Sequence, residues 1–481
     1  TSIIYFYLDR VTYNKKIKYI TVDIFLVLYL LLCNTTSLLR CTVMNILLSI
    51  NYLLKLDIKK IDIVLLTLIL CITINPFIIY DIGFIYSYTI SFFLILYKNK
   101  YKTNNKLLKI IYISLISFLV SLPINIYTSY EINFLSIILN IIIVPIVSLI
   151  LLPLSLLTLI FPILDNILYL ITSILEKISL YTSNINIFKQ ILSKPSIILI
   201  IIYYLVIILI LSKNKHYYLI LILLIFHKTI PLYNSNLEVV MFDVGEADSM
   251  LISTPSKKVN ILIDTGRGID INNIIIYLKS IGISKLNYLI ITHGDEDHIG
   301  GALYLIDNFK VDNVILNKGD YTELEVELIT HLKNKNIKYT NNINKIPLLG
   351  SYMYLLNTKK FSNENDNSIV TYFEYQKYKF LFMGDSSSKT EEYLINNYNL
   401  TNISFLKVGH HGSNTSSSPL FINKITPKVS LISVGRNNFY HHPNKEVLTN
   451  LSNSVIYRTD INKSIKIKIN NKVKITKLNN N

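Results

Sequence analysis

The sequence predicts a multi-pass α-helical membrane domain over residues 1–235, followed by an α/β domain over residues 236–481. Up to about Tyr233 the chain is dominated by Ile, Leu, Tyr and Phe. Several of its apolar runs approach the roughly 20 residues that a helix needs to cross a bilayer. From Leu237 onward, short apolar runs that end in turns alternate with helical stretches, which is typical of a soluble α/β domain.

The first half contains more consecutive apolar runs than a soluble core can absorb. These runs lie at about 18–34, 61–80, 82–97, 110–129, 134–163, 163–183, 196–212 and 216–233. The prolines that interrupt them are Pro76, Pro123, Pro145, Pro153 and Pro162. Because proline frees a backbone carbonyl that must then bond elsewhere, broken helices favour a pore or transporter over a simple anchor.

The distribution of lysine predicts the orientation of the chain in the membrane. Basic segments at 55–60, 98–109 and 212–215 are expected on the cytoplasmic side. One further span, 216–233, then carries the chain across. The second domain is therefore expected to lie outside the cytoplasm.

Composition narrows the function only in part. The net charge of +16 fits a nucleic-acid partner, but it fits equally well a general excess of Lys, Asn, Ile and Tyr. Cys33, Cys41 and Cys71 all lie in the apolar half, so the second domain has no thiolate metal ligands. The chain begins at Thr1 rather than at Met and shows no signal-peptide pattern, which suggests a fragment.

In the second half, several predicted strands end directly in acids or histidines. Helical stretches are expected between them at 271–281, 298–308 and 388–398. Strand ends meet at one rim of a sheet, and a stiff scaffold holds the side chains there. The rim residues are Asp264, His293, Asp295, Asp297, His298, Asp385, His410 and His411. Imidazole and carboxylate ligands suit zinc, manganese or iron, so the sequence predicts a metal site.

These motifs resemble the metallo-β-lactamase fold, an αβ/βα sandwich. "THGDEDHIGG" (292–301) is similar to its H-x-H-x-D-H loop, with Asp295 where the second histidine is usual. "LIDTG" resembles the fold's early strand-end Asp, "FLFMGD" its later Asp motif and "LKVGHHGS" a late histidine motif. The change at Asp295 adds an oxygen ligand and makes manganese as suitable as zinc. No clear motif supplies the fold's middle histidine, since His331 belongs to a predicted exposed helix and Asp366 is only an alternative.

The two halves together resemble the ComEC-type DNA-uptake channels of bacterial competence. "SLLRCTVM" (37–44), "NPFIIYDIGFIYSYT" (75–89) and "NIIIVPIVSLILLPLSLL" (140–157) are similar to motifs of the membrane half. "FDVGEADSMLI", "ISVGRNNFYHHPN" and "VIYRTD" are similar to motifs of the metal domain, with Ala247 where glycine is usual. The resemblance covers nearly the whole chain, without the family's amino-terminal soluble domain and first membrane helices.

The resemblance implies a centre with two divalent ions, Mn²⁺ or Zn²⁺. His293, Asp295 and His410 are expected to hold one ion, Asp297 and His298 the other, and Asp385 to bridge them. Asp264 is expected to orient the loop, and His411 is the alternative to His410. Asp297 and His442 are the catalytic candidates, with His442 either protonating the leaving oxygen or lying in an ordinary loop. Ser413 and Lys407 are expected to contact phosphate.

The resemblance also implies a channel in the bacterial inner membrane for single-stranded DNA, with an extracytoplasmic nuclease that degrades the strand left outside. Expected partners are DNA, membrane lipid and other competence proteins. The latter include a separate ATP-driven motor, because the chain lacks a G-x-x-x-x-G-K-[ST] loop. A homo-oligomer is left open. Two alternatives remain: a transporter with an inactive metal domain, and an extracellular phosphodiesterase acting on cell-wall polymers.

The carboxyl-terminal segment 465–478 alternates apolar residues with lysine around Asn470 and Asn471, which predicts a β-hairpin. Its basic face could bind DNA. Lysine on an edge strand also prevents edge-to-edge aggregation, and this second interpretation is favoured.

Overall fold

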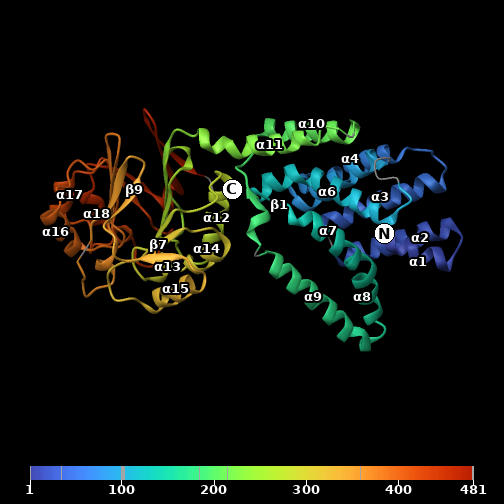
Figure 1. The fold of residues 1–481 in the computed structure, drawn as a ribbon, viewed down its shortest axis with the longest axis horizontal. Helices are drawn as coiled ribbons and strands as arrows, with labels where there is room; N and C mark the ends of the chain where they lie inside the picture. The colour runs from blue at the N-terminus through green and yellow to red at the C-terminus, as the bar shows by residue number, and fades with distance from the viewer. Residues whose placement is uncertain are drawn as a thin grey trace. The chain divides into compact units, whose positions relative to one another are not determined.

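The computed structural model describes residues 2–33, 35–98, 103–183, 185–213, 215–357 and 359–478. The chain forms two compact units, Thr1–His227 and Lys228–Asn481 (Figure 1). The predicted division at residues 235 and 236 lies a few residues further along the chain. Residues 99–102 and 214, which belong to two of the predicted basic segments, lie outside the described residues.

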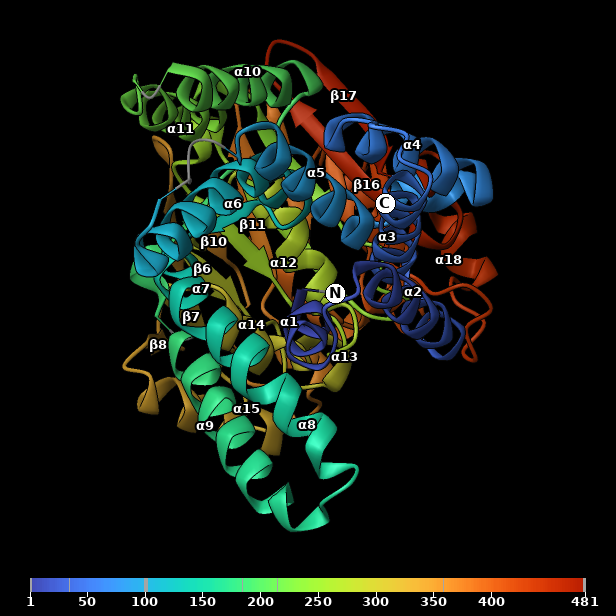
Figure 2. The ribbon, with the colours of Figure 1, turned by 90° about the vertical axis from the view of Figure 1, so that its right-hand side faces the viewer.

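The first unit is almost entirely helical. Its α-helices are α1 (Ser2–Val11), α2 (Lys15–Leu32), α3 (Thr36–Leu53), α4 (Lys60–Ile74), α5 (Ile82–Leu96), α6 (Lys106–Thr128), α7 (Leu135–Ile146), α8 (Leu152–Thr158), α9 (Asp165–Ser183), α10 (Ile197–Lys213) and α11 (Tyr218–Thr229). Two short antiparallel strands, β1 (Glu131–Asn133) and β2 (Lys189–Ile191), pair with each other. Helices α8 and α9 lie side by side (Figure 2).

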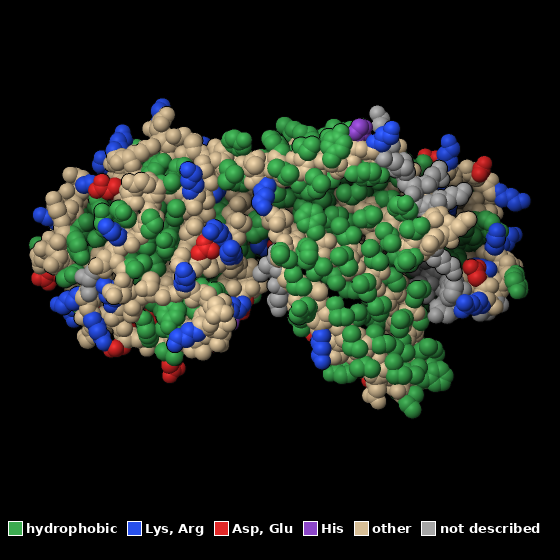
Figure 3. Space-filling view, viewed as in Figure 1, with side chains coloured by type: hydrophobic (Ala, Val, Ile, Leu, Met, Phe, Trp, Pro, Cys, Tyr) green, Lys and Arg blue, Asp and Glu red, His purple; other side chains and the backbone are tan. Residues whose placement is uncertain are grey.

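Within the described residues, two helical stretches are long and apolar enough to cross a bilayer, Leu107–Thr128 and Leu135–Thr158. Apolar side chains cover most of the visible face of this unit (Figure 3). Ile163, for example, is 84% exposed. Exposure of such an apolar side chain is unfavourable in water but not in lipid. These observations support a membrane protein, while the full number of spans stays a prediction.

Proline and polar caps divide one predicted span, whereas the interruptions expected at Pro123 and Pro145 are absent, because both prolines lie inside helices. The expected span 61–80 is broken, because α4 ends at Ile74 and a 3₁₀ turn, Pro76–Tyr80, follows. Asp81 then caps α5 by accepting a hydrogen bond from the Phe84 amide at 2.6 Å. Segment 37–44, one of the motifs that resemble the membrane half of the competence channels, lies inside α3.

The second unit is built from two β-sheets. One has the strand order β17-β16-β3-β4-β5-β6-β7-β8 and the other β15-β14-β13-β12-β11-β10-β9. The first sheet contains β3 (Leu237–Met241), β4 (Met250–Ser253), β5 (Asn260–Ile263), β6 (Tyr288–Ile290), β7 (Asn313–Ile315), β8 (Lys338–Thr340), β16 (Ser464–Ile469) and β17 (Val473–Leu478). The second contains β9 (Lys345–Leu348), β10 (Ser351–Leu355), β11 (Thr371–Tyr375), β12 (Tyr378–Phe382), β13 (Phe405–Lys407), β14 (Val429–Ile432) and β15 (Val455–Arg458).

A continuous apolar core holds the two sheets together. Val239 and Ile261 of the first sheet belong to the same buried cluster as Phe373 and Phe380 of the second. The rings of Phe373 and Phe380 stack with centroids 4.5 Å apart. The alternation of apolar residues along each strand produces this arrangement, because every second side chain points to the same face.

Helices cover the outer faces of the sheets. They are α12 (Ile271–Ser280), α13 (Glu296–Ile299), α14 (Ala302–Asn308), α15 (Glu323–Asn334), α16 (Ser388–Asn397), α17 (Pro419–Ile425), α18 (Lys445–Asn450) and α19 (Thr459–Asn462). The three helical stretches predicted in this half are confirmed, with the stretch 298–308 divided at Gly300 and Gly301. The predicted hairpin is also confirmed, and β17 forms an edge of its sheet, as expected for lysine that protects an edge.

Candidate metal centre

The candidate site lies where parallel strands of both sheets end. Strands β5 and β6 are parallel neighbours in one sheet, and β12 and β13 are parallel neighbours in the other. The side chains that follow these strands are Asp264 (after β5), His293 (after β6), Asp385 (after β12), and His410 and His411 (after β13). Each is therefore held by a stiff element at its carboxyl end.

The loop after β6 packs tightly against the start of α15. A Cβ atom on Gly294 would lie 2.2 Å from Thr322 Oγ1, which leaves no space for a side chain there. Thr322 and Glu325 cap α15 reciprocally, and the Thr322 hydroxyl donates to the Gly294 carbonyl at 3.1 Å. This packing fixes the backbone from which the neighbouring acids and histidines project.

His298 is oriented with one ring nitrogen toward the site. Its Nδ1 donates to Asp264 Oδ2 at 2.9 Å, and Asp264 also accepts hydrogen bonds from the amide and hydroxyl of Thr292, each at 2.8 Å. Because Nδ1 carries the proton, Nε2 carries the lone pair. Among the described residues this buried Nε2 has no hydrogen-bond partner.

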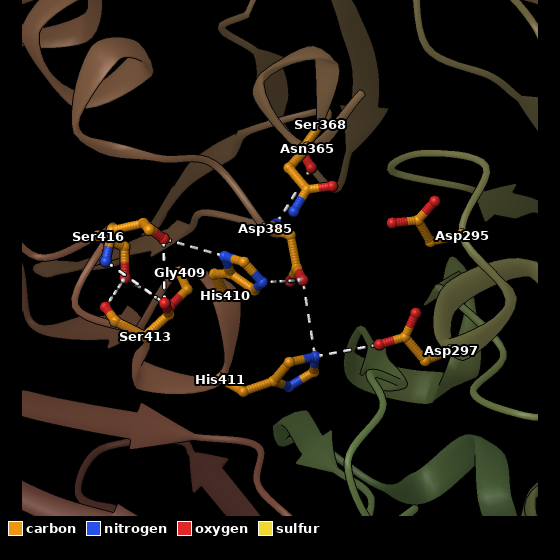
Figure 4. Close-up of polar contacts among 12 residues, drawn as sticks. Asp295, Asp297, Asn365, Ser368, Asp385, Gly409, His410, His411, Ser413 and Ser416 are labelled. Atoms are coloured by element: carbon orange, nitrogen blue, oxygen red, sulfur yellow. Dashed lines mark hydrogen bonds and ion pairs between the residues drawn. The ribbon is translucent and has the colours of Figure 1, made fainter. Parts of the chain in front are cut away.

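His411 is oriented in the same way from the other sheet. Its Nδ1 lies 2.9 Å from the carbonyl oxygen of Ser433, which can only accept, so Nδ1 is the protonated nitrogen. Its Nε2 lies 3.3 Å from Asp297 Oδ2 and 3.6 Å from Asp385 Oδ2 (Figure 4). The two histidines thus direct lone pairs toward the same two carboxylates.

Asp297, His298, Asp385 and His411 form one cluster whose ligand atoms all lie within 4.8 Å of one another. Within the part of the chain that the structure describes, Asp385 Oδ1 is a buried oxygen that accepts no hydrogen bond. Two imidazole nitrogens and two carboxylates form a donor set that suits zinc or manganese. The residues present therefore fit a divalent ion.

Opposite charges in the cluster shift its pKa values strongly. Burial alone would raise the pKa of Asp297, but the His411 hydrogen bond and the charge of His298 outweigh it and lower the pKa to about 2. Burial alone would lower the pKa of His411, but Asp385, Asp297 and Asp248 raise it to about 9. A site whose carboxylates draw protons onto its imidazoles offers the same stabilisation to a metal cation.

His293 and Asp295 lie beside this cluster. His293 Nε2 is 3.4 Å from Asp295 Oδ2, and the His293 and His298 rings have centroids 4.1 Å apart. At the position where a middle histidine was sought, Ser368 Oγ lies 3.3 Å from His293 Nδ1 and accepts from the Asp385 amide at 3.1 Å. His293 and Asp295 thus offer one imidazole and one carboxylate beside the cluster.

His410 lies further from the cluster than its neighbour His411. Its Nε2 is 4.0 Å from Asp385 Oδ2, its side chain is 28% exposed, and its Nδ1 lies 3.1 Å from Thr415 Oγ1. Both histidines have left-handed backbone, with φ of 46° and 52°. This turn points the two rings in different directions, and it is His411 that meets Asp297.

His442 borders the site from the loop after β14. Its Nδ1 lies 2.8 Å from Glu246 Oε1, and its ring stacks on that of His411 with centroids 6.4 Å apart. The Glu246 carboxylate also accepts from the Gly435 amide at 2.7 Å. No local motif indicates the pairing of Glu246 with His442, because 196 residues separate them.

The residues expected to contact phosphate, Lys407 and Ser413, and the alternative acid Asp366 do not belong to the metal cluster. Lys407 is 2% exposed and pairs with Asp248, so its predicted contact with substrate is wrong for a physical reason: the ammonium does not reach the surface. Ser413 is buried, and its Oγ accepts a hydrogen bond from the Thr415 hydroxyl at 3.1 Å. Asp366 accepts from the Ser387 amide at 3.1 Å and supports the start of α16 rather than the cluster.

The fold and the cluster together define a hydrolase domain of the metallo-beta-lactamase superfamily, which residues 242–436 match. Residues 1–215 match the Competence protein family. The two matches lie side by side in the sequence and together account for most of the chain.

Two relatives illustrate the extent of the similarity. ComE operon protein 3 of Bacillus subtilis is 27% identical over 517 residues, which cover 98% of this chain and 66% of that protein. Competence protein ComA of Neisseria gonorrhoeae is 30% identical over 215 residues, 44% of this chain and 28% of that protein. The chain thus spans about two thirds of the first relative and under a third of the second.

A solved structure similar to the second domain is that of Igni18, a metallo hydrolase from Ignicoccus hospitalis. It is 15% identical, with a TM-score of 0.33, and the match covers 48% of this chain and 100% of that one.

Proposed function

We propose that the chain conducts single-stranded DNA across the inner membrane and that its second domain hydrolyses phosphodiester bonds outside the cytoplasm. The observation that carries the hydrolytic part is the convergence of His298 Nε2 and His411 Nε2 on Asp297 and Asp385. Competence relatives and apolar helices that contain proline, α6 with Pro123 and α7 with Pro145, support the transport part.

In this proposal Asp297, His298, Asp385 and His411 hold one divalent ion. His293 and Asp295, together with Asp385, would contribute to holding a second. When bound, such ions supply the acidity that generates a nucleophile from water and the positive charge that stabilises a phosphodiester under attack.

The chain's own residues perform the remaining tasks. Asp264 and Ser433 fix the ring orientations of His298 and His411. His442, oriented by Glu246, holds a proton for the departing oxygen. Its ring lies at the edge of the cluster, next to the His410 ring, with centroids 6.0 Å apart.

A metal titration on the purified full-length chain tests the hydrolytic activity. The chain is stripped with a chelator, and Mn²⁺ or Zn²⁺ is added in the presence of end-labelled single-stranded DNA. We expect cleavage that depends on the metal, is lost in His411→Ala, and is retained in His331→Ala, whose histidine pairs with Asp307 and not with a residue of the cluster. Cleavage of a choline-phosphate ester but not of DNA would instead favour the cell-wall phosphodiesterase.

Protease treatment of intact spheroplasts tests the orientation. We expect the second domain to be digested from outside while the cells remain sealed. Protection of that domain, with digestion only after lysis, would place it in the cytoplasm and overturn the proposed route.

A further inference from the structure

Beneath the metal cluster lies a buried lysine that the proposed chemistry does not use. The Lys407 ammonium pairs with Asp248, donates to the Gly384 carbonyl at 3.0 Å, and lies 3.7 Å from Asp385 Oδ1. Its side chain is 2% exposed and that of Asp248 is 4% exposed. A buried ammonium of this kind is stable only because carboxylates surround it.

Asp248, Asp264 and His298 also have the spacing of a metal site. Two of these three side chains, however, already use the relevant atoms in hydrogen bonds. Asp264 accepts from both donors of Thr292, and His298 directs its N–H, not its lone pair, at Asp264. Only Asp248 remains, and its neighbouring cation is Lys407.

Asp385 lies between the metal cluster and the buried pair of Lys407 and Asp248. One of its oxygens faces His411, at 3.6 Å, and the other lies near both His298 Nε2, at 3.3 Å, and the Lys407 ammonium. The Lys407 ammonium thus lies on the buried side of the Asp385 carboxylate. The other side of that carboxylate faces the proposed metal ion. The ammonium occupies the position that a further cation would take.

We propose that Lys407 is a positioning residue that acts as a built-in cation, fixing Asp385 and occupying the place of an additional divalent ion between Asp248 and Asp385. This inference rests on the proposed metal centre. It predicts that removal of the ammonium opens a new site for one divalent ion, because Asp248 then lacks its counter-charge and Asp385 lacks the one on its buried side.

The test compares the full-length chain with Lys407→Met, a substitution of similar volume. Bound manganese per chain is measured after desalting, and thermal unfolding is recorded with and without Mn²⁺. We expect Lys407→Met to bind one more ion per chain than the unsubstituted protein. We also expect it to unfold at a lower temperature without metal, and Mn²⁺ to raise its unfolding temperature by more than it raises that of the unsubstituted chain.

Two further variants separate this effect from simple loss of stability. Lys466→Met removes another buried lysine, which pairs with Glu238, and should destabilise the domain without changing the number of bound ions. The double variant Asp248→Asn/Lys407→Met removes both charges of the pair and should bind the original number of ions.

An unchanged manganese content in Lys407→Met, or a variant that stays unfolded at all Mn²⁺ concentrations, would overturn the inference. Absence of metal from the unsubstituted chain would remove the proposed hydrolytic function. A gain of one ion in Lys407→Met would nevertheless still support the role of Lys407.

Discussion

The second domain contains two buried acidic clusters that are neutralised in different ways. In one, Glu238 of β3 is surrounded by lysines, with ammonium nitrogens of Lys257, Lys466 and Lys468 at 2.5, 2.9 and 3.5 Å. In the other, the carboxylates of the metal cluster have one lysine among them, Lys407. The first cluster has its cations built in, whereas the second requires cations from outside.

The pKa values express the same difference. Burial alone would raise the pKa of Glu238, but Lys257 and Lys466 outweigh it and lower the pKa to about 2. The pKa of Asp297 is also lowered to about 2, but by imidazoles that must be neutral to bind metal. The lowered pKa of Glu238 therefore indicates a carboxylate that lysines stabilise. The lowered pKa of Asp297 indicates a cluster with a surplus of negative charge once its imidazoles are neutral.

Loss of a ligand should give the largest effect. Asp297→Asn removes a charge and a donor from the metal cluster, so we expect the affinity for Mn²⁺ to fall by more than about 100-fold, since even residues behind the ligands contribute about 10–100-fold. Isothermal titration of the stripped chain measures this. An affinity within a few-fold of the original would show that Asp297 is not a ligand.

Substitution at the other cluster should affect stability and leave metal binding unchanged. Glu238→Gln leaves Lys257 and Lys466 buried without a counter-ion, which should lower the free energy of opening by about 3–5 kcal/mol. Hydrogen exchange of the β3 and β16 amides measures this energy. Unchanged protection of these amides would contradict the comparison of the two clusters. Lys360→Ala provides a matched control, because it breaks an exposed pair with Asp320 and should change the free energy of opening by close to zero.

The contribution of Glu238 should also depend on pH. Since its pKa is about 2 in the folded chain and near 4.5 in an unfolded one, its stabilisation is fully present above about pH 4.5 and is lost as the pH falls toward 2. This shift corresponds to about 3 kcal/mol. The difference in amide protection between the unsubstituted chain and Glu238→Gln should therefore shrink between pH 5 and pH 2.5. A constant difference would mean that the lysines do not set the pKa.

The sequence revealed the strand-end acids because local motifs carry them. Asp264, His293 and Asp385 each follow a strand, and the strand pattern is readable from apolar alternation, while His298 lies in the short helix α13 that follows the same loop. The choice of His411 over His410 was not readable, because it depends on left-handed backbone at both residues. The role of Lys407 depends on burial against Asp248, 159 residues away, for which no local pattern exists.

In the first unit, apolar composition predicted helices but not where they are interrupted. The span expected over 61–80 looked continuous by hydropathy. Asn75 and Asp81 cap the following helical segments through side-chain hydrogen bonds and so divide it. Polar caps of this kind are only two residues within a long apolar run, and an average over the run conceals them.

Asp264 provides a further test of the comparison between the two clusters. It is an acid of the metal site whose carboxylate is stabilised by hydrogen bonds rather than by a lysine. In Asp264→Asn, the amide oxygen can still accept from the Thr292 amide, but the NH₂ group would face His298 Nδ1. An NH₂ donor requires Nδ1 to accept, which moves the ring proton to Nε2 and blocks the lone pair aimed at the cluster. We expect a loss of Mn²⁺ affinity of about 10–100-fold, measured by isothermal titration.

The fold should tolerate the Asp264→Asn substitution, since the amide has nearly the shape of the carboxylate and keeps one of its acceptors. Hydrogen exchange in β5 and β6 should therefore change little while the metal affinity falls. Equal affinity in the two proteins would show that His298 does not ligate through Nε2. The surplus negative charge that distinguishes this cluster from the Glu238 cluster would then need a different cation-binding arrangement.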